Sequence, residues 1–502
     1  MLDFENLEKY RENNRIEAKK AVGGLPKSIW ETYSAFANTL GGVILLGVEE
    51  HADRSLHPVC LPDPEGLVKA FWDAVNNPNK ASANILSDKD VQIVEVDGCR
   101  IIEIFVPRAE RGVKPVYIDG NPLTGTYRRN GEGDYHCTQD AVRAMLRDAA
   151  VQTQDTVLLE RMDLDVFDYD SVHRYRNRLR NHRPGHVWDE LDDVTFLYKL
   201  GAIGRSEDGV MHPTAAGLLM FGFEYEIVKE FPYYFLDYQE KMDAETRWTD
   251  RIVSTSGDWS GNIYDFYFRV YQRIAQDIKV PFKMENGERI DDTPVHGALR
   301  EALANCLINA DYYESRGVVI VKTKDGITIS NPGGFRIDLN EAKSGGISDP
   351  RNTTLIKMFN LINIGERAGS GIPNIYNVWK KQGWQEPEIS ENFEPPRISV
   401  NLPLEKSGGK KAAVKSGGKK AAVKSGDKKL SAKTIEHRNR IVDYLTVNVT
   451  AGRNELAELL GLKDSRVKVI LSEMVADEII VAEGDFKTRV YRLKEQAGGK
   501  DF

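Results

Sequence analysis

Residues 296–335 read HGALREALANCLINADYYESRGVVIVKTKDGITISNPGGF, and this stretch decides the fold of the middle of the chain. Its first part is typical of a long helix, and GVVIVKTK and GITIS are typical of strands. The strands lead into NPGGF, a glycine-rich loop at Asn331 to Phe335. A helix, strands and a glycine-rich loop in this order predict an α/β sandwich of the size that holds a nucleotide.

Further motifs extend this pattern. Glu301 and Asn305 are four residues apart and share one helical face, where they can present a base and a metal ligand together; Asp311 follows in the same segment. DPRN begins at 349, and a second glycine-rich loop, GERAGSGI at 365–372, leads into another predicted helix. Over about residues 290–404, these motifs resemble the GHKL-type (Bergerat) ATP-binding domain of gyrase, MutL and histidine kinases.

The resemblance implies ATP and Mg²⁺ as ligands. It assigns Asn305 to the Mg²⁺ that bridges the phosphates, Glu301 to polarising the attacking water, and Asn331 to the adenine edge. Asn331 stands where gyrase-like members carry Asp, and an amide can also accept from the exocyclic amine. Residues 344–352, SGGISDPRN, are the candidate lid. Close backbone approach to the ligand is expected at four glycines, for which plain turns are the alternative: Gly333, Gly334, Gly369 and Gly371.

The first 150 residues predict an α+β domain. SAFANTLGGVILLGVEE at 34–50 joins a helical segment through a Gly-Gly turn to an apolar strand from Val43 to Val48. VQIVEVDG and CRIIEIFVP are strand-like runs around Asp97-Gly98, which is a strong hairpin signal. A helix from Gln139 to Arg147 closes the predicted domain.

Acidic residues in this domain form the pattern E-x4-E-x-K, which SAFAN-x2-GG and GVEE follow. The ordered set resembles the Schlafen AlbA-type (divergent AAA) domain over roughly residues 5–148. In nucleolytic members three carboxylates cleave tRNA or other nucleic acid; here they would be Glu12, Glu17 and Glu50, with Lys19 beside them. Clustered carboxylates hold Mg²⁺ or Mn²⁺, which activates water against a phosphodiester. The alternative is that Glu12 and Glu17 are solvated helix residues.

The C-terminal part is predicted to contain a tether and a small domain. KSGGKKAAV begins at Lys406, recurs at Lys415, and starts again as KSGDKK. Nine lysines and one aspartate give 406–429 a local charge of +8, which favours a solvated linker over 406–432; a basic arm that scans nucleic acid is the alternative. Residues 433–496 show three predicted helices and a hairpin, the order of a winged helix-turn-helix.

Nucleic-acid contacts are expected from basic residues in two places. On the recognition helix and wing of the predicted winged helix they are Arg466, Lys468, Lys487 and Arg489. In the N-terminal domain, Arg128 and Arg129 beside Tyr127 can face a sugar-phosphate backbone. The alternatives are a winged helix that binds protein and, in the N-terminal domain, ordinary surface charge.

Composition limits the remaining possibilities. The 502 residues, 41% hydrophobic and 29% charged, predict several soluble domains, and residues 151–285 read as a connector with two short helices around a small hairpin. No apolar run is long enough to span a bilayer and no signal peptide is apparent, so a cytoplasmic location is expected. Four widely spaced cysteines, with no C-x-x-C pair, favour buried thiols over disulfides.

These features predict a multidomain α+β protein: a Schlafen-like domain (1–150), a connector (151–285), a GHKL-like ATP domain (286–405), a linker (406–432) and a winged helix (433–496). The functional hypothesis is an oligomeric protein whose ATP state controls nucleic-acid engagement, with metal-dependent cleavage of RNA or DNA in phage defence as its possible output. The alternatives are a transcriptional regulator that uses ATP as a ligand, without nuclease activity, and an ATP-gated scaffold.

Overall fold

The computed structural model describes most of residues 3–404 and a small part of the C-terminal region. The described residues are 3–243, 246–276, 278, 283–285, 288–290, 293–365, 369–404, 441, 444–445, 451–460, 467, 470–471, 474–475, 480–483 and 490–493. Contacts divide the chain into one unit that ends at Lys411 and a second that begins at Ala412. The division falls inside the lysine repeat.

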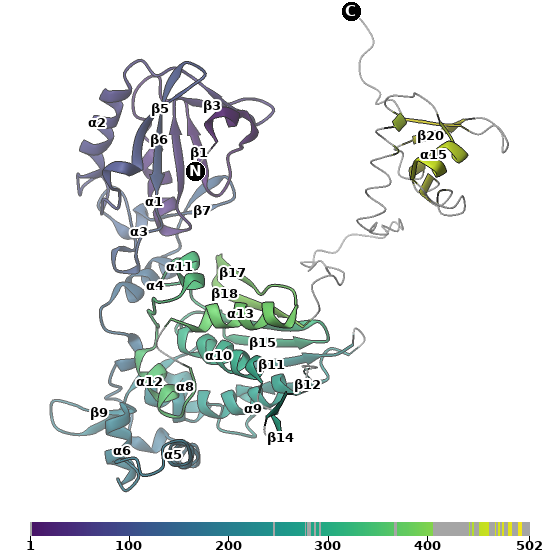
Figure 1. Ribbon diagram of the computed structural model, residues 1–502. Coiled ribbons are helices and arrows are strands. Elements are labelled where there is room, and N and C mark those ends of the chain that lie inside the picture. The colour runs from purple at the N-terminus through teal and green to yellow at the C-terminus, as the bar shows by residue number, and fades with distance from the viewer. Residues whose placement is uncertain are drawn as a thin grey trace, which may run out of the picture. The chain divides into compact units, whose positions relative to one another are not determined.

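The N-terminal module is built on a four-stranded sheet of order β1-β2-β6-β5, in which only β1 and β2 run parallel. Figure 1 shows α1 and α2 beside this sheet, in purple. The opposite face packs against the 3₁₀ helix Phe4–Lys9 and the β3–β4 hairpin. The bounds are β1 Ile16–Lys19, α1 Ile29–Asn38, β2 Gly42–Leu46, β3 Val48–Glu50, β4 Leu56–Pro58, α2 Pro64–Val75, β5 Val91–Val96, β6 Cys99–Val106, α3 Pro122–Gly125, β7 Tyr127–Asn130, β8 Gly133–His136 and α4 Gln139–Ala149.

Two turns in this module follow from residues with positive φ. Asp97 and Gly98 have φ of 49° and 75°, which is the turn that the sequence predicted between β5 and β6. The expected strand from Val43 to Val48 is interrupted at Gly47, where φ is +85° and a Cβ would lie 2.9 Å from the Val59 carbonyl oxygen. The interruption redirects the chain into β3, which carries Glu50.

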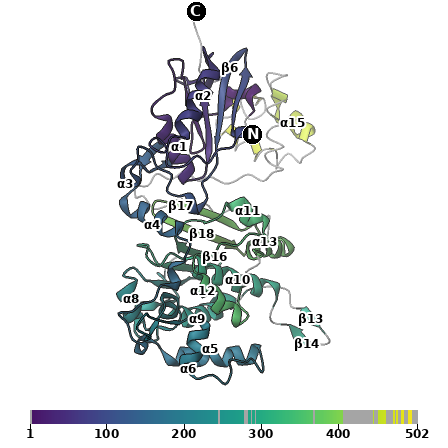
Figure 2. The ribbon, with the colours of Figure 1, turned by 90° about the vertical axis from the view of Figure 1, so that its left-hand side faces the viewer.

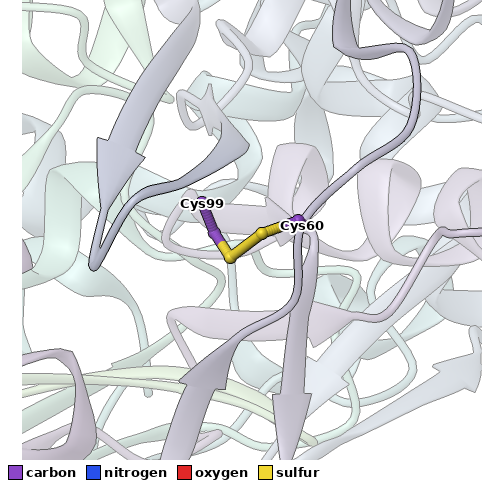
Figure 3. The surroundings of a disulfide bond; sticks show 2 residues. All are labelled: Cys60 and Cys99. Atoms are coloured by element: carbon purple, nitrogen blue, oxygen red, sulfur yellow. A yellow bond between two sulfur atoms is a disulfide. The ribbon is translucent and has the colours of Figure 1, made fainter.

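The prediction that all cysteines are thiols was wrong. Cys60 and Cys99 form a disulfide, with Cα atoms 4.5 Å apart (Figure 3), whereas Cys137 and Cys306 are free. The pairing joins the segment after β4 to the start of β6, and the Leu61 amide donates to the Arg100 carbonyl beside it. The sequence separation of 39 residues contains no signal of this proximity, because tertiary structure creates it.

In the sequence, a group of helices with a small hairpin follows the N-terminal module and precedes the second large sheet. The expected arrangement of two short helices around a hairpin is confirmed by α6, β9, β10 and α7. Its buried residues share one hydrophobic core with those of residues 231–404, which are called the ATP module here after the ligand that the sequence analysis predicted for them. The bounds are α5 Tyr169–His182, α6 Asp193–Leu200, β9 Ile203–Arg205, β10 Met211–Pro213, α7 Ala215–Phe221 and α8 Glu224–Glu230.

The ATP module contains a six-stranded sheet of order β12-β11-β15-β16-β18-β17. Its first two strands lie upstream of residue 286, so the sheet begins before the expected start of the GHKL-like domain. Helix α10 packs against α9, α13 and β16; Figure 2 shows α10 and α13 beside β16 and β18. The bounds are β11 Leu236–Lys241, β12 Asp250–Val253, α9 Ile263–Ala275, β13 Lys283–Glu285, β14 Glu288–Ile290, α10 Pro294–Asn309, β15 Val318–Thr323, β16 Gly326–Pro332, α11 Leu339–Ser344, α12 Thr353–Leu361, α13 Gly371–Gln382, β17 Glu388–Phe393 and β18 Pro396–Pro403.

Alternating burial along β15 explains why helices cover one face of this sheet. Val318, Ile320 and Lys322 are buried, and the residues between them are half-buried. The inward Lys322 is tolerated because its ammonium donates to the carbonyl oxygens of Arg273 and Gln276, at 2.7 and 3.0 Å. The lysine therefore caps the C-terminal end of α9.

In its described part, the second unit contains a three-stranded antiparallel sheet and helix α15, and the described residues 441, 444–445, 467, 470–471 and 474–475 are also helical. The strand order is β19-β21-β20, and Leu456, Ile470 and Tyr491 lie in a common core. The bounds are β19 Ala451–Gly452, α15 Arg453–Leu460, β20 Ile480–Glu483 and β21 Val490–Leu493. Among the described residues of the whole chain, no helix combines the length and apolar character needed to cross a bilayer.

We expect Leu303→Ala to lower the free energy of unfolding by about 2–5 kcal/mol, because Leu303 is fully buried on α10 and its loss leaves a cavity. Urea denaturation followed by circular dichroism measures the change. The matched control is Leu146→Ala, where the side chain is 48% exposed and the loss should stay below about 1 kcal/mol. Equal losses in the two variants would contradict the assigned core.

Candidate functional site

The largest concentration of predicted site residues lines one pocket of the ATP module. Its wall includes Glu301 and Asn305 of α10, Asn331 and Gly334 of the NPGGF loop, and residues of α13. Apolar side chains complete it, among them Ile347, Ile356, Ile375, Ile389, Ile398 and Val400. An apolar slot with a few convergent polar groups is the usual form of a small-molecule site.

Helix α10 brings the first two polar groups together. Its opposite face is buried in the core, so Glu301 and Asn305 face the pocket one helical turn apart. The Asn305 Nδ2 donates to Glu301 Oε1 at 3.1 Å. This orientation turns the amide oxygen of Asn305 away from Glu301, where it can serve as an oxygen ligand. One such ligand, completed by phosphate oxygens, suits Mg²⁺.

The second glycine loop covers these two side chains closely. A Cβ on Gly371 would lie 2.8 Å from Asn305 Nδ2 and would also collide with the Glu301 carboxylate. Gly369 has φ of +65°, and a Cβ there would lie 2.6 Å from the Ile347 carbonyl oxygen. The Gly346 amide donates to the Gly369 carbonyl at 3.3 Å, so the candidate lid contacts the loop directly. Neighbouring atoms therefore lie too close to Gly369 and Gly371 for any residue with a Cβ atom.

Asn331 lies at the end of β16, buried, with its amide orientation fixed. Its Nδ2 donates to the carbonyl oxygens of Asn309 and Pro332, at 3.4 and 3.1 Å. The amide oxygen is therefore the atom left to face a ligand, and among the described residues nothing donates to it. An acceptor at this place matches a purine that carries an exocyclic amine.

Arg351, which the sequence analysis placed only within the DPRN motif, organises the glycine loop. Its guanidinium makes two hydrogen bonds with the Asp148 carboxylate, at 2.9 and 2.6 Å, and donates to the carbonyls of Asn309 and Gly334. Gly333, with φ of +92°, has no room for a Cβ because the Arg351 guanidinium lies against it. Burial alone would raise the pKa of Asp148, but the charge of Arg351 holds it below its usual value.

Two further arginines of the N-terminal module reach the pocket loops. Arg108 binds both oxygens of Glu391 on β17, at 2.5 and 2.9 Å, and donates to the Phe335 carbonyl at 2.7 Å. Glu391 in turn accepts from the Phe335 amide at 2.8 Å. Arg111 binds Asp349 of the candidate lid at 2.5 Å. No sequence motif pointed to Arg108 or Glu391, since each finds its partner more than 280 residues away.

The predicted carboxylate cluster of the N-terminal module lies around β1. The alternative that Glu12 and Glu17 are solvated helix residues was wrong, because Ile16–Lys19 is a strand and Glu17 is 7% exposed. Glu12 accepts from the Ala18 amide at 3.0 Å. Burial raises the pKa of Glu12, and the nearby Glu17 and Glu50 carboxylates raise it further. The three predicted acids therefore gather in one region.

Glu17 has both oxygens occupied by cations. Oε1 pairs with Lys19 at 2.6 Å and Oε2 pairs with Arg129 at 2.7 Å. Arg129 also binds Asp134 at 2.9 Å and the Asn13 carbonyl. Among the described residues, no group of three or more His, Cys, Asp or Glu side chains is placed to hold a metal ion. Two protein cations thus neutralise Glu17, and the arrangement does not fit a metal at this carboxylate.

The expectation that Arg129 faces a sugar-phosphate backbone does not fit its position. Its side chain is 1% exposed, and its guanidinium is paired with Glu17 and Asp134. Arg128 donates to the Phe393 carbonyl at 2.6 Å and lies against the ATP module. An alternation of inward and outward residues on β7 could have separated the two arginines in advance. Arg466, Lys468, Lys487 and Arg489 lie outside the described residues.

Three stretches of the chain match known families. Residues 12–138 match the family "Schlafen, AlbA_2". The N-terminal resemblance is therefore confirmed at the level of the domain. Residues 315–399 match "Putative ATP-dependent DNA helicase recG C-terminal", and residues 143–237 match "Domain of unknown function (DUF8451)". No curated protein matches the chain. The GHKL assignment and the winged helix remain predictions.

Two solved structures are similar. The crystal structure of the DIP2311 protein from Corynebacterium diphtheriae is 16% identical, with 96% of this chain and 95% of that chain covered and a TM-score of 0.38. The N-terminal domain of a RecG-related protein from Nitrosomonas europaea, titled a putative ATP-dependent DNA helicase, is 31% identical over 28% of this chain and 95% of that chain, with a TM-score of 0.22. Both TM-scores lie below 0.5, so neither bears on function.

We expect Gly371→Ala to weaken ATP binding at least tenfold, because the added methyl group displaces the Glu301 and Asn305 side chains. Titration calorimetry with ATP and Mg²⁺ measures the affinity. Gly23→Ala, at a glycine with nothing within 4 Å of its Cβ position, is the control and should bind as the wild type does. Unchanged affinity in Gly371→Ala would exclude this pocket as the ATP site.

We expect Glu17→Gln and Glu12→Gln to change stability in opposite directions at pH 7. Glu17→Gln removes one of the two carboxylates that pair with the buried Arg129 and should destabilise the protein by about 1–3 kcal/mol, since Asp134 remains as a partner. Glu12 has a raised pKa in the folded state, so its ionisation opposes folding above that pKa, and an uncharged glutamine should be neutral or stabilising.

Urea denaturation at pH 7 and at pH 4 tests both variants. The Glu12→Gln difference should shrink at pH 4, because wild-type Glu12 is then largely protonated in the folded state. Two equal losses, or a gain in thermal stability with Mn²⁺ that both variants abolish, would instead favour a metal held between these carboxylates.

Proposed function

We propose that this protein binds ATP in the pocket between α10 and the glycine loops, and that nucleotide occupancy controls the engagement of nucleic acid. The observation that carries the proposal is that side chains of both modules hydrogen-bond to the pocket loop. Phe335 of NPGGF is bonded through both its amide and its carbonyl to the Arg108–Glu391 pair, and Arg108 belongs to the module that matches the Schlafen AlbA_2 family. A ligand that shifts this loop changes the contact with the N-terminal module.

The residues of the pocket fit ATP and Mg²⁺. Asn331 offers an acceptor to an adenine amine, Asn305 offers an oxygen to Mg²⁺, and the close approach at Gly369 and Gly371 leaves backbone N–H groups for phosphates at the start of α13. Mg²⁺ would neutralise phosphate charge. Glu301 is the residue placed to polarise water if ATP is hydrolysed. Cys306 also lines the pocket, but burial raises the pKa of its thiol to about 12, which leaves it unreactive.

The geometry of the N-terminal module does not favour cleavage of nucleic acid. Glu17 is neutralised by Lys19 and Arg129, so the carboxylate that a metal-dependent nuclease would use is committed to ion pairs. We therefore favour a nucleic-acid-binding regulator over a nuclease, with the predicted C-terminal winged helix as a second point of contact. The name of the family matched at 315–399, an ATP-dependent DNA helicase C-terminal region, supports the pairing of ATP with nucleic acid.

The coupling test compares wild type with Arg108→Met. Fluorescence anisotropy with labelled tRNA, single-stranded DNA and duplex DNA gives the dissociation constants with and without ATP and Mg²⁺. We expect ATP to change the wild-type constant for the preferred nucleic acid by about fivefold or more, and the Arg108→Met constant by less than twofold. The physical reason is that the variant loses the bonds joining Phe335 and Glu391 to the N-terminal module.

Arg100→Met is the matched control, because Arg100 is an exposed arginine of the same module that pairs with Glu65 on the surface. It should keep the full ATP effect. Equal ATP effects in wild type and Arg108→Met would refute the coupling. If shorter nucleic-acid products appear with Mn²⁺ and are absent with Glu17→Ala, the nuclease hypothesis would be correct and the regulator hypothesis wrong.

A further inference from the structure

A second, smaller cavity lies where the N-terminal module meets the ATP module, and the proposed function does not use it. Lys114 and Arg128 line it from one side, and Gly333, Glu391 and Phe393 line it from the other. Lys114 follows the 3₁₀ helix Arg111–Val113, and Arg128 lies on β7, so different segments bring the two cations together.

The carboxylates nearest to Lys114 are already bound to arginines. Glu391 gives both oxygens to Arg108, and Asp148 gives both oxygens to Arg351. Glu314, farther along the cavity wall, lies 3.8 Å from Arg147. Asp311, the fourth acid on the wall, lies 3.2 Å from Arg147, so each acid of this cavity forms an ion pair with an arginine other than Arg128.

Lys114 and Arg128 have few partners of their own. In the part of the chain that the structure describes, neither has a carboxylate within 4 Å; Lys114 donates only to the Asn38 carbonyl at 3.3 Å. Arg128 donates to the Phe393 carbonyl, and its buried Nε has no partner. Burial lowers the pKa of Lys114 well below its usual value, and the adjacent Arg108 and Arg128 charges add to this effect, against Glu391 and Asp148.

Two neighbouring cations that are partly removed from water are costly unless an anion joins them. We propose that this cavity binds a phosphate group, held between the Lys114 ammonium and the Arg128 guanidinium. A tetrahedral oxyanion has enough acceptor atoms for the ammonium hydrogens and the unpartnered Nε–H at once, which a spherical anion such as chloride lacks. Free orthophosphate and a phosphodiester of nucleic acid share this chemistry.

The site is distinct from the ATP pocket but shares its walls. Gly334, Phe335 and Arg336 line both cavities, so a phosphate bound at Lys114 lies on the other side of the loop that the nucleotide contacts. The loop of Gly334, Phe335 and Arg336 would then contact the nucleotide on one side and the phosphate group on the other.

Thermal unfolding of the full-length protein tests the proposal, with orthophosphate replacing chloride at constant ionic strength. We expect orthophosphate to raise the wild-type melting temperature by about 1.5 °C at ten times its dissociation constant. Lys114→Met should abolish this rise. Without phosphate, it should melt at or above the wild-type temperature, because a buried cation without a carboxylate has been removed. Lys69→Met, at an exposed lysine of the same module, should behave as the wild type does.

Three further arms separate the possible outcomes. Arg128→Met must also lose the phosphate effect, which keeps the proposal testable if Lys114→Met does not fold. Gly371→Ala must retain it, since that variant is directed at the ATP pocket. In the last arm, a short oligonucleotide without terminal phosphates replaces orthophosphate. If the melting temperature rises with the oligonucleotide but not with orthophosphate, and the rise needs Lys114, the ligand is a phosphodiester. Equal rises in wild type and both cation variants, or no rise with either ligand, would overturn the proposal.

Discussion

The bidentate pair between Arg351 and Asp148 is the interaction on which the arrangement of the ATP module depends. It joins the end of α4, the last helix of the N-terminal module, to the start of α12. The same guanidinium bonds the carbonyls of Asn309 and Gly334, so it also fixes α10 relative to the glycine loop. Burial alone would lower the pKa of Arg351, but the charge of Asp148 holds it above its usual value.

Arginines recur wherever the two modules touch, and each performs a different task. Arg108 holds the Phe335 loop through Glu391, Arg111 holds Asp349 of the candidate lid, and Arg128 donates to the Phe393 carbonyl. A planar guanidinium can bridge a carboxylate and several carbonyls at once, which suits contacts between loops that carry many unpaired backbone groups. The proposed nucleotide site and the contact between the modules therefore use the same few loops.

Several features were predictable because local residue pattern determines them. The hairpin at Asp97-Gly98 needs two residues with positive φ, and the sequence supplies them; the Glu301–Asn305 spacing places both residues on one helical face. Others were not. The strand at Ile16–Lys19 is short and carries two charged residues, so its pattern also fits a solvated helix, and only pairing with β2 decides between them.

By itself, the sequence determined the order of the modules, the helix that carries Glu301 and Asn305, and the glycine positions around the pocket, because spacing and turn chemistry act over a few residues. Tertiary structure alone decided that Cys60 pairs with Cys99, that Arg129 is buried with Glu17, and that Lys114 and Arg128 meet in one cavity. These outcomes join residues tens to hundreds of positions apart, and burial and charge pairing, which set their roles, exist only after the chain has folded.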